Sequence, residues 1–171
     1  MATSIVFTLV GPDRPGLVDK IASCVAKAGG NWEESQLAHL GGQFAGMVRV
    51  RIEPANEAAL REGLATLEGL TVTVATARDE FEPRGRNVHL EVLGTDRPGI
   101  VKEIGHTLAN FGINIEELTT STESAAMTGE TLFRAEAELC IPEGLPPKQV
   151  REALEQLADE LMVELVLQEP T

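Results

Sequence analysis

The chain repeats itself: residues 11–34 align with residues 94–117 when the sequence is shifted by 83 positions. Twelve of the 24 aligned pairs are identical, whereas roughly one or two matches are expected between unrelated sequences of ordinary composition. In the first copy the identical residues are Gly11, Asp13, Arg14, Pro15, Gly16, Val18, Ile21, Ala26, Gly29, Asn31, Glu33 and Glu34. The period exceeds the roughly 20–50 residues of solenoid repeats, so we expect two small domains in tandem.

Each copy is predicted to have the order strand, helix, strand, strand, helix, strand. In the first copy a strand is predicted over 4–10 and a helix over 15–28, followed by two extended runs on either side of Gly41-Gly42. A second helix is predicted from the helical spacing of Leu60, Leu64 and Leu67, and a last strand over 71–77. In the second they are a strand over 88–93, a helix over 98–111, a strand over 114–121, a turn over 124–128, an alternating run over 131–139, a helix after Pro146 and a strand over 162–168. Pro15 is expected at the first helical position, where its missing N–H is not needed.

This order is that of the split-βαβ, ferredoxin-like fold, in which two helices cover one face of an antiparallel sheet. We therefore expect an α+β protein of two ferredoxin-like βαββαβ domains, residues 1–79 and 87–171, joined by a polar linker over 80–86. Domains of about 80 residues have small cores, and their edge strands need cover. The two domains are therefore expected to lie side by side, or the chain to form a homo-oligomer.

The formal net charge is −13, from 27 acidic and 14 basic residues. A field of this sign repels phosphate backbones and anionic membranes, and no basic stripe offsets it. No apolar run approaches the roughly 20 residues of a membrane-spanning helix, and Met1–Pro12 lacks the pattern of a signal peptide. Cys24 and Cys140 are expected to be packed, reduced thiols. These features predict a cytoplasmic protein without a direct nucleic-acid or membrane partner.

The loop 11–16 and its twin 94–99 lie between a strand and the start of a helix. Free N–H groups and the positive end of the helix dipole suit a carboxylate at such a place. Asp13 or Asp96 can accept a hydrogen bond from an ammonium group, so the two charges of an α-amino acid match this turn. The same residue types are ordinary turn and capping residues, and the loop by itself leaves both interpretations open.

Asn31 and Asn114 follow the first helix of each copy, at the start of the next strand. An amide offers both a donor and an acceptor to a zwitterion. An asparagine that tolerates left-handed backbone geometry after a helix is an equally good explanation.

The pattern strand, Gly-x-Asp-Arg-Pro-Gly, helix, Gly-x-Asn, strand resembles the ACT domain family, small regulatory ligand-binding modules attached to amino-acid metabolic enzymes. It occurs over 11–32 and over 94–115, so the resemblance covers nearly the whole chain as two ACT units. The segments 128–133 and 140–142 also resemble transcription regulators that consist of two ACT domains.

The resemblance implies an amino-acid effector bound between paired ACT units. By motif match, one site would contain Gly11, Asp13, Pro15, Gly16, Asn31 and Trp32, and the other Gly94, Asp96, Pro98, Gly99, Asn114 and Ile115. Trp32 stands where the family usually has an aliphatic residue. Its indole is expected either to narrow the first pocket or to pack in the seam between domains. The second loop is therefore expected to be the more open one.

These features predict a non-catalytic regulator that senses a small amino acid, with glycine as one candidate. It would act through a protein partner, such as a DNA-binding regulator of amino-acid metabolism. The sequence has no metal-ligand spacing and no GxSxG, P-loop or HExxH pattern, so neither an enzyme nor a cofactor or metal is expected. A ligand-free dimerisation module and a regulatory subunit of a separate metabolic enzyme are the alternatives.

Overall fold

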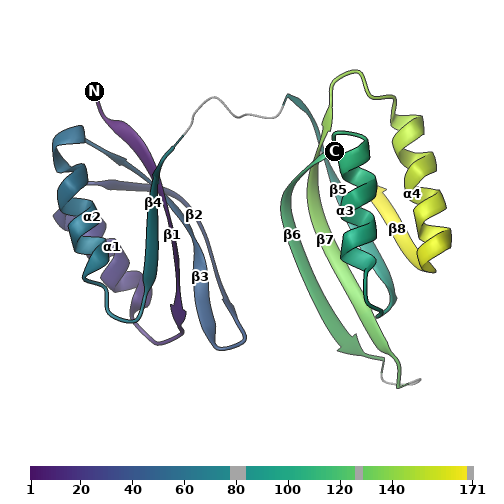
Figure 1. The fold of residues 1–171 in the computed structure, drawn as a ribbon, viewed down its shortest axis with the longest axis horizontal. Coiled ribbons are helices and arrows are strands. Elements are labelled where there is room, and N and C mark those ends of the chain that lie inside the picture. Colours follow the sequence, from purple (N-terminus) through teal and green to yellow (C-terminus); the bar gives the residue numbers. More distant parts are fainter. Residues whose placement is uncertain (78–83, 126–128, 169–171) are drawn as a thin grey trace. The chain divides into compact units, whose positions relative to one another are not determined.

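The computed structural model describes residues 1–77, 84–125 and 129–168 (Figure 1). The chain divides into two compact units, Met1–Phe81 and Glu82–Thr171, and each is described by itself. No helix within the described ranges is long and apolar enough to cross a membrane.

The described part of the first unit contains four strands and two α-helices. In chain order they are β1 (Thr3–Pro12), α1 (Leu17–Lys27), β2 (Asn31–Leu40), β3 (Gln43–Ile52), α2 (Glu57–Ala65, preceded by a 3-10 turn over Pro54–Asn56) and β4 (Thr71–Thr76). The sheet has the order β2-β3-β1-β4, and every neighbouring pair is antiparallel. Both helices cover the same face of this sheet (Figure 1).

The second unit repeats this arrangement. Its elements are β5 (Gly85–Thr95), α3 (Ile100–Asn110), β6 (Asn114–Ser124), β7 (Thr131–Pro142), α4 (Pro147–Leu161) and β8 (Val163–Gln168). The strand order is β6-β7-β5-β8, again antiparallel throughout. The predicted fold class, two ferredoxin-like βαββαβ domains with antiparallel sheets, is confirmed.

Each unit has its own hydrophobic core between its sheet and its helices. Alternate residues of the central strand β1, Ile5, Phe7 and Leu9, are buried because successive side chains of a strand point to opposite faces. Leu60 and Leu64 of α2 lie four residues apart, on one helical face, and are buried against them. Cys24 and Cys140, as predicted, are reduced thiols, and burial raises the pKa of both.

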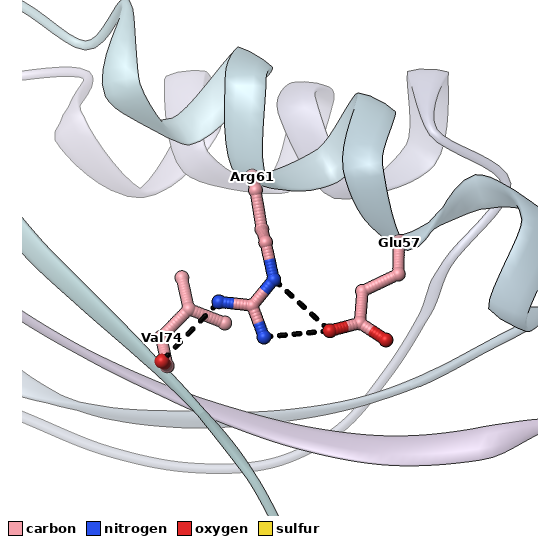
Figure 2. Close-up of polar contacts among 3 residues, drawn as sticks. All are labelled: Glu57, Arg61 and Val74. Atoms are coloured by element: carbon pink, nitrogen blue, oxygen red, sulfur yellow. Dashed lines mark hydrogen bonds and ion pairs between the residues drawn. The ribbon is translucent and has the colours of Figure 1, made fainter.

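An arginine ties α2 to the edge strand β4 (Figure 2). Arg61 donates from Nε and Nη2 to one oxygen of Glu57, one helical turn earlier, at 2.9 and 2.6 Å. Its Nη1 donates to the backbone carbonyl of Val74 at 3.3 Å. The side chain therefore joins a helical ion pair to a contact between the helix and the sheet.

The starts of α1 and α3 differ from the prediction. Pro15 is not the first helical residue, because Gly16 is the N-cap and α1 begins at Leu17. Gly16 has a φ of 85° and turns the chain into the helix, which leaves Pro15 in the preceding turn. Pro98 and Gly99 repeat this arrangement, with a φ of 98° at Gly99.

Two predicted connections fall partly outside the described residues, at 78–83 and 126–128. β5 begins at Gly85, inside the segment predicted as linker, because pairing with β7 continues to Pro142. β6 likewise extends to Ser124, opposite Thr131. At the end of α4, Met162 adopts a left-handed conformation with a φ of 51°, so the last strand begins one residue later than predicted.

Candidate ligand-binding loops

The first loop is attached to the tip of the β2–β3 hairpin. The backbone N–H of Asp13 donates to the carbonyl of Gly42 at 2.9 Å. The Asp13 carboxylate contacts Nδ1 of His39, near the end of β2. Gly41 and Gly42 form the predicted hairpin turn, both with positive φ. The hairpin therefore brings His39, which the sequence analysis did not select, to the candidate ligand-binding carboxylate.

The second loop has the same backbone anchor but a different side-chain environment. The N–H of Asp96 donates to the carbonyl of Thr131, at the start of β7, at 2.8 Å. Thr122 occupies the position equivalent to His39, because it pairs with Phe133 as His39 pairs with Phe44. Within the described residues the exposed Asp96 carboxylate has no hydrogen bond or ion pair. Within the described residues, Asp96 is therefore the unpaired one of the two loop carboxylates.

The arginine of each loop binds a backbone carbonyl at the end of the second helix of its unit. Arg97 Nη2 donates to Glu160, in the last turn of α4, at 3.2 Å. Arg14 Nη2 donates to the carbonyl of Glu68, just beyond α2. Cations are favoured at a helix C-terminus by its dipole. The arginines thus hold the loops in place, a role that the sequence analysis did not assign although both copies contain the residue.

The two glycines of each loop are required for different reasons. A Cβ on Gly11 would lie 2.1 Å from the carbonyl oxygen of Gly69, and one on Gly94 would lie 2.5 Å from Val163 Cγ1. These glycines are therefore explained by the close approach of the chain's own segments. Gly16 and Gly99 instead have positive φ, and a Cβ there would meet nothing within 4 Å. The helix-start glycines thus border open space.

The asparagine and the loop of one unit are far apart. Asn31 pairs with Arg51 at one end of β3, whereas Pro12, next to Asp13, pairs with Gln43 at the other end. Eight residues of extended chain separate these ends by roughly 27 Å. One small molecule therefore cannot touch the loop and the asparagine of the same unit.

The second unit has the same separation. Asn114 pairs with Cys140, whereas Thr95, next to Asp96, pairs with Leu132. The amide of Asn114 donates to the carboxylate of Glu116.

Trp32 and Ile115 occupy equivalent positions beside a shared irregularity. The strand register shifts between Trp32 and Glu34 and again between Ile115 and Glu117, so each copy contains a β-bulge at this point. Trp32 is half-buried against the core of the first unit, and Ile115 packs against that of the second. Both side chains thus contribute to the packing of their own unit.

No group of three or more His, Cys, Asp or Glu side chains suited to a metal ion occurs in the described part of the chain. The polar groups of the loops are carboxylates, backbone N–H groups and arginines tied to carbonyls. This set can bind and orient a small charged molecule.

Comparisons with known proteins match both halves of the chain to one family. Models of the ACT domain match residues 3–75 and 88–159. The glycine cleavage system transcriptional repressor of Escherichia coli (strain K12) is 26% identical over 162 residues, which cover 92% of this chain and 85% of that protein.

Two solved structures resemble the whole chain. A protein from Galdieria sulphuraria described as unknown is 32% identical, with a TM-score of 0.87 and 100% of both chains covered. A proposed glycine cleavage system transcriptional repressor is 21% identical, with a TM-score of 0.73, covering 100% of this chain and 99% of that one.

Proposed function

Because the chain belongs to the ACT domain family, with two ACT domains in tandem, we propose that it is a non-catalytic regulatory protein that senses a small amino acid. The first candidate for the effector is glycine, and the response is passed to a protein partner in the cytoplasm. The name of its relative, a glycine cleavage system transcriptional repressor, supports both the effector and a role in transcriptional control.

The observation that carries this proposal is the contrast between the two loop carboxylates. Asp96 is exposed and unpaired within the described residues, beside the open space at Gly99 and the N-terminus of α3. An ammonium group can donate to Asp96 while a carboxylate accepts from N–H groups of the helix start. In the first loop the corresponding carboxylate already contacts His39. We therefore assign the principal effector site to the second loop.

A complete site needs more than one ACT domain. Asn31 and Asn114 lie at the ends of their sheets remote from the loops of the same units. An asparagine that contacts the effector at the second loop must therefore come from another ACT domain. Pro98 and Gly99 shape the loop, whereas Asp96 supplies the charge.

Calorimetric titration of the full chain with glycine and with larger amino acids tests the effector. We expect heat of binding for glycine that Asp96→Asn removes. Asp13→Asn is the matched control, because its carboxylate is already paired, and it should retain most of the binding. The assignment would be contradicted if no amino acid gave heat of binding at millimolar concentration, or if both variants lost the same amount of glycine binding.

The protein partner is proposed to be a DNA-binding regulator rather than DNA itself. A net charge of −13 opposes contact with phosphates. The tagged full chain should capture such a regulator from native lysate in a glycine-dependent amount, and Asp96→Asn should abolish the dependence on glycine. Direct, salt-sensitive binding of the purified chain to DNA would contradict this part of the proposal.

A further inference from the structure

The two sheets differ in charge on the faces that their helices leave uncovered. We call these the first open face, on the sheet of β1–β4, and the second open face, on the sheet of β5–β8. Because side chains alternate along a strand, the residues of each open face follow from the pairing registers. The duplication makes the two faces comparable position by position.

The second open face is strongly acidic. Its outward-facing glutamates are Glu91, Glu117, Glu123, Glu136, Glu138 and Glu164. Glu91 lies directly opposite Glu136, and His89 lies opposite Glu138. Arg134 is the one arginine that the registers place among them, 3.9 Å from Glu123, and His89 lies 2.7 Å from Glu138. Six glutamates against one arginine still leave this face with an excess of negative charge.

The first open face has balanced charge. Thr8 and Met47 take the positions of Glu91 and Glu136, since Thr8 pairs with Met47 in the equivalent register. Its carboxylates are Glu33 and Glu34, and both are neutralised: Glu33 is 2.6 Å from Arg51 and Glu34 is 3.6 Å from Arg49.

The first open face also exposes apolar side chains. Val10 is 45% exposed, Met47 48% and Leu40 82%. A hollow of about 540 Å³ crosses the face and is lined in part by Val6, Met47 and Arg49. Exposed apolar side chains with balanced polar neighbours are typical of a surface that associates with another protein.

We propose that two copies of this chain associate through their first open faces. Two chains of charge −13 repel each other, so they can approach closely only where positive and negative charges are balanced. A two-fold dimer places the same patch on both sides of the interface, and a neutral, apolar patch is compatible with itself. A dimer formed through the second open faces would instead place the six glutamates of one copy opposite the six of the other. This inference does not depend on which effector the loops bind.

Sedimentation of the full chain measures the association, and the duplication supplies variants that the fold is expected to accept. The wild type should be a dimer. The double variant Thr8→Glu/Met47→Glu copies Glu91 and Glu136 and should raise the dimer Kd at least ~100-fold, because like charges are then opposed across the interface.

Ala45→Arg, which copies Arg134, should weaken the dimer as well, although it adds the opposite charge. This second variant keeps the test decisive if circular dichroism shows that the first one is unfolded. The matched control Glu91→Gln/Glu136→Gln changes the other face and should leave the dimer intact. A monomeric wild type, a dimer that tolerates both first-face variants, or a control that dissociates would each overturn the proposal.

Discussion

Arg97 of the second loop donates a hydrogen bond of 3.2 Å to the backbone carbonyl of Glu160, in the last turn of α4. Its twin, Arg14, makes the corresponding contact with Glu68. Each arginine joins the strand-to-helix turn to the chain segment at the end of the second helix, where carbonyl groups lack helical partners. The Arg of the repeated motif is thus explained by the fold, whereas the Asp beside it in the second loop is the residue that we propose contacts the effector.

Arg97→Ala should lower the free energy of unfolding of the second unit by about 1–2 kcal/mol, the usual effect of losing a hydrogen bond from a charged donor. Urea unfolding followed by circular dichroism measures the change. The fluorescence of Trp32, the only tryptophan of the chain, reports the first unit and should be unaffected. Arg151→Ala, on an exposed position of α4, is the control, and an equal loss in both variants would refute the prediction.

Gly94→Ala should destabilise the second unit by about 2 kcal/mol or more, because the added Cβ would lie 2.5 Å from Val163 Cγ1. Gly105→Ala tests the opposite case. This glycine is inside α3, and a Cβ there meets nothing within 4 Å, so alanine should stabilise the unit by about 0.5–1 kcal/mol. Thermal unfolding should separate the two variants in opposite directions, and a shared direction would contradict the close approach at Gly94.

The stability of the second unit should fall as the pH rises through the neutral range. The hydrogen bond with Glu138, at 2.7 Å, raises the pKa of His89, and the charges of Glu91 and Glu136 act in the same direction. A raised pKa in the folded state gives stability that is complete below about pH 6.5 and is lost as the pH passes the folded value.

His89→Gln should flatten this dependence between about pH 6 and pH 8, and so should Glu138→Gln, which removes the hydrogen-bond acceptor. His106→Gln, on an exposed position of α3, is the control for the loss of an imidazole elsewhere in the unit. Urea unfolding at several pH values gives the slopes. If His89→Gln and the wild type had the same slope, the interaction would not contribute in solution.

Replacing His39 by threonine should open the first loop. Thr122 occupies this position in the second unit, so the substitution copies a residue that the fold accepts. It removes the imidazole that contacts Asp13 and leaves the carboxylate available. The number of amino-acid molecules bound per chain in calorimetry should rise, and His39→Thr/Asp13→Asn should reverse the gain. An unchanged stoichiometry would show that His39 does not block the loop.

Much of the fold could be predicted because its determinants are local or repeated. Alternation in Ile5, Phe7 and Leu9 shows which face of β1 is buried, and the Gly41-Gly42 pair marks the hairpin. The helix starts were misplaced because proline and glycine both favour this turn. Only the observed φ of 85° shows that Gly16 is the cap.

The site was harder to predict because it depends on which ends of the strands meet. The sequence separates Asp13 from His39 by 26 residues, and only the hairpin between β2 and β3 brings them together. The same hairpin carries Asn31 to the opposite end of the sheet. Motif matching selects Asp13 and Asn31 together, although one unit cannot present both to the same small molecule.

The strand order also bears on how the chain folds during synthesis. β1 is synthesised before the other strands of its unit, yet it lies between β3 and β4, and Ile5 pairs with Thr76 at the far end of the unit. The nascent sheet therefore stays incomplete until β4 emerges. Until then the central strand β1 lacks a neighbour that is distant in sequence. Because the described sheet of the first unit consists of β1–β4, it can form while the second half is still being translated.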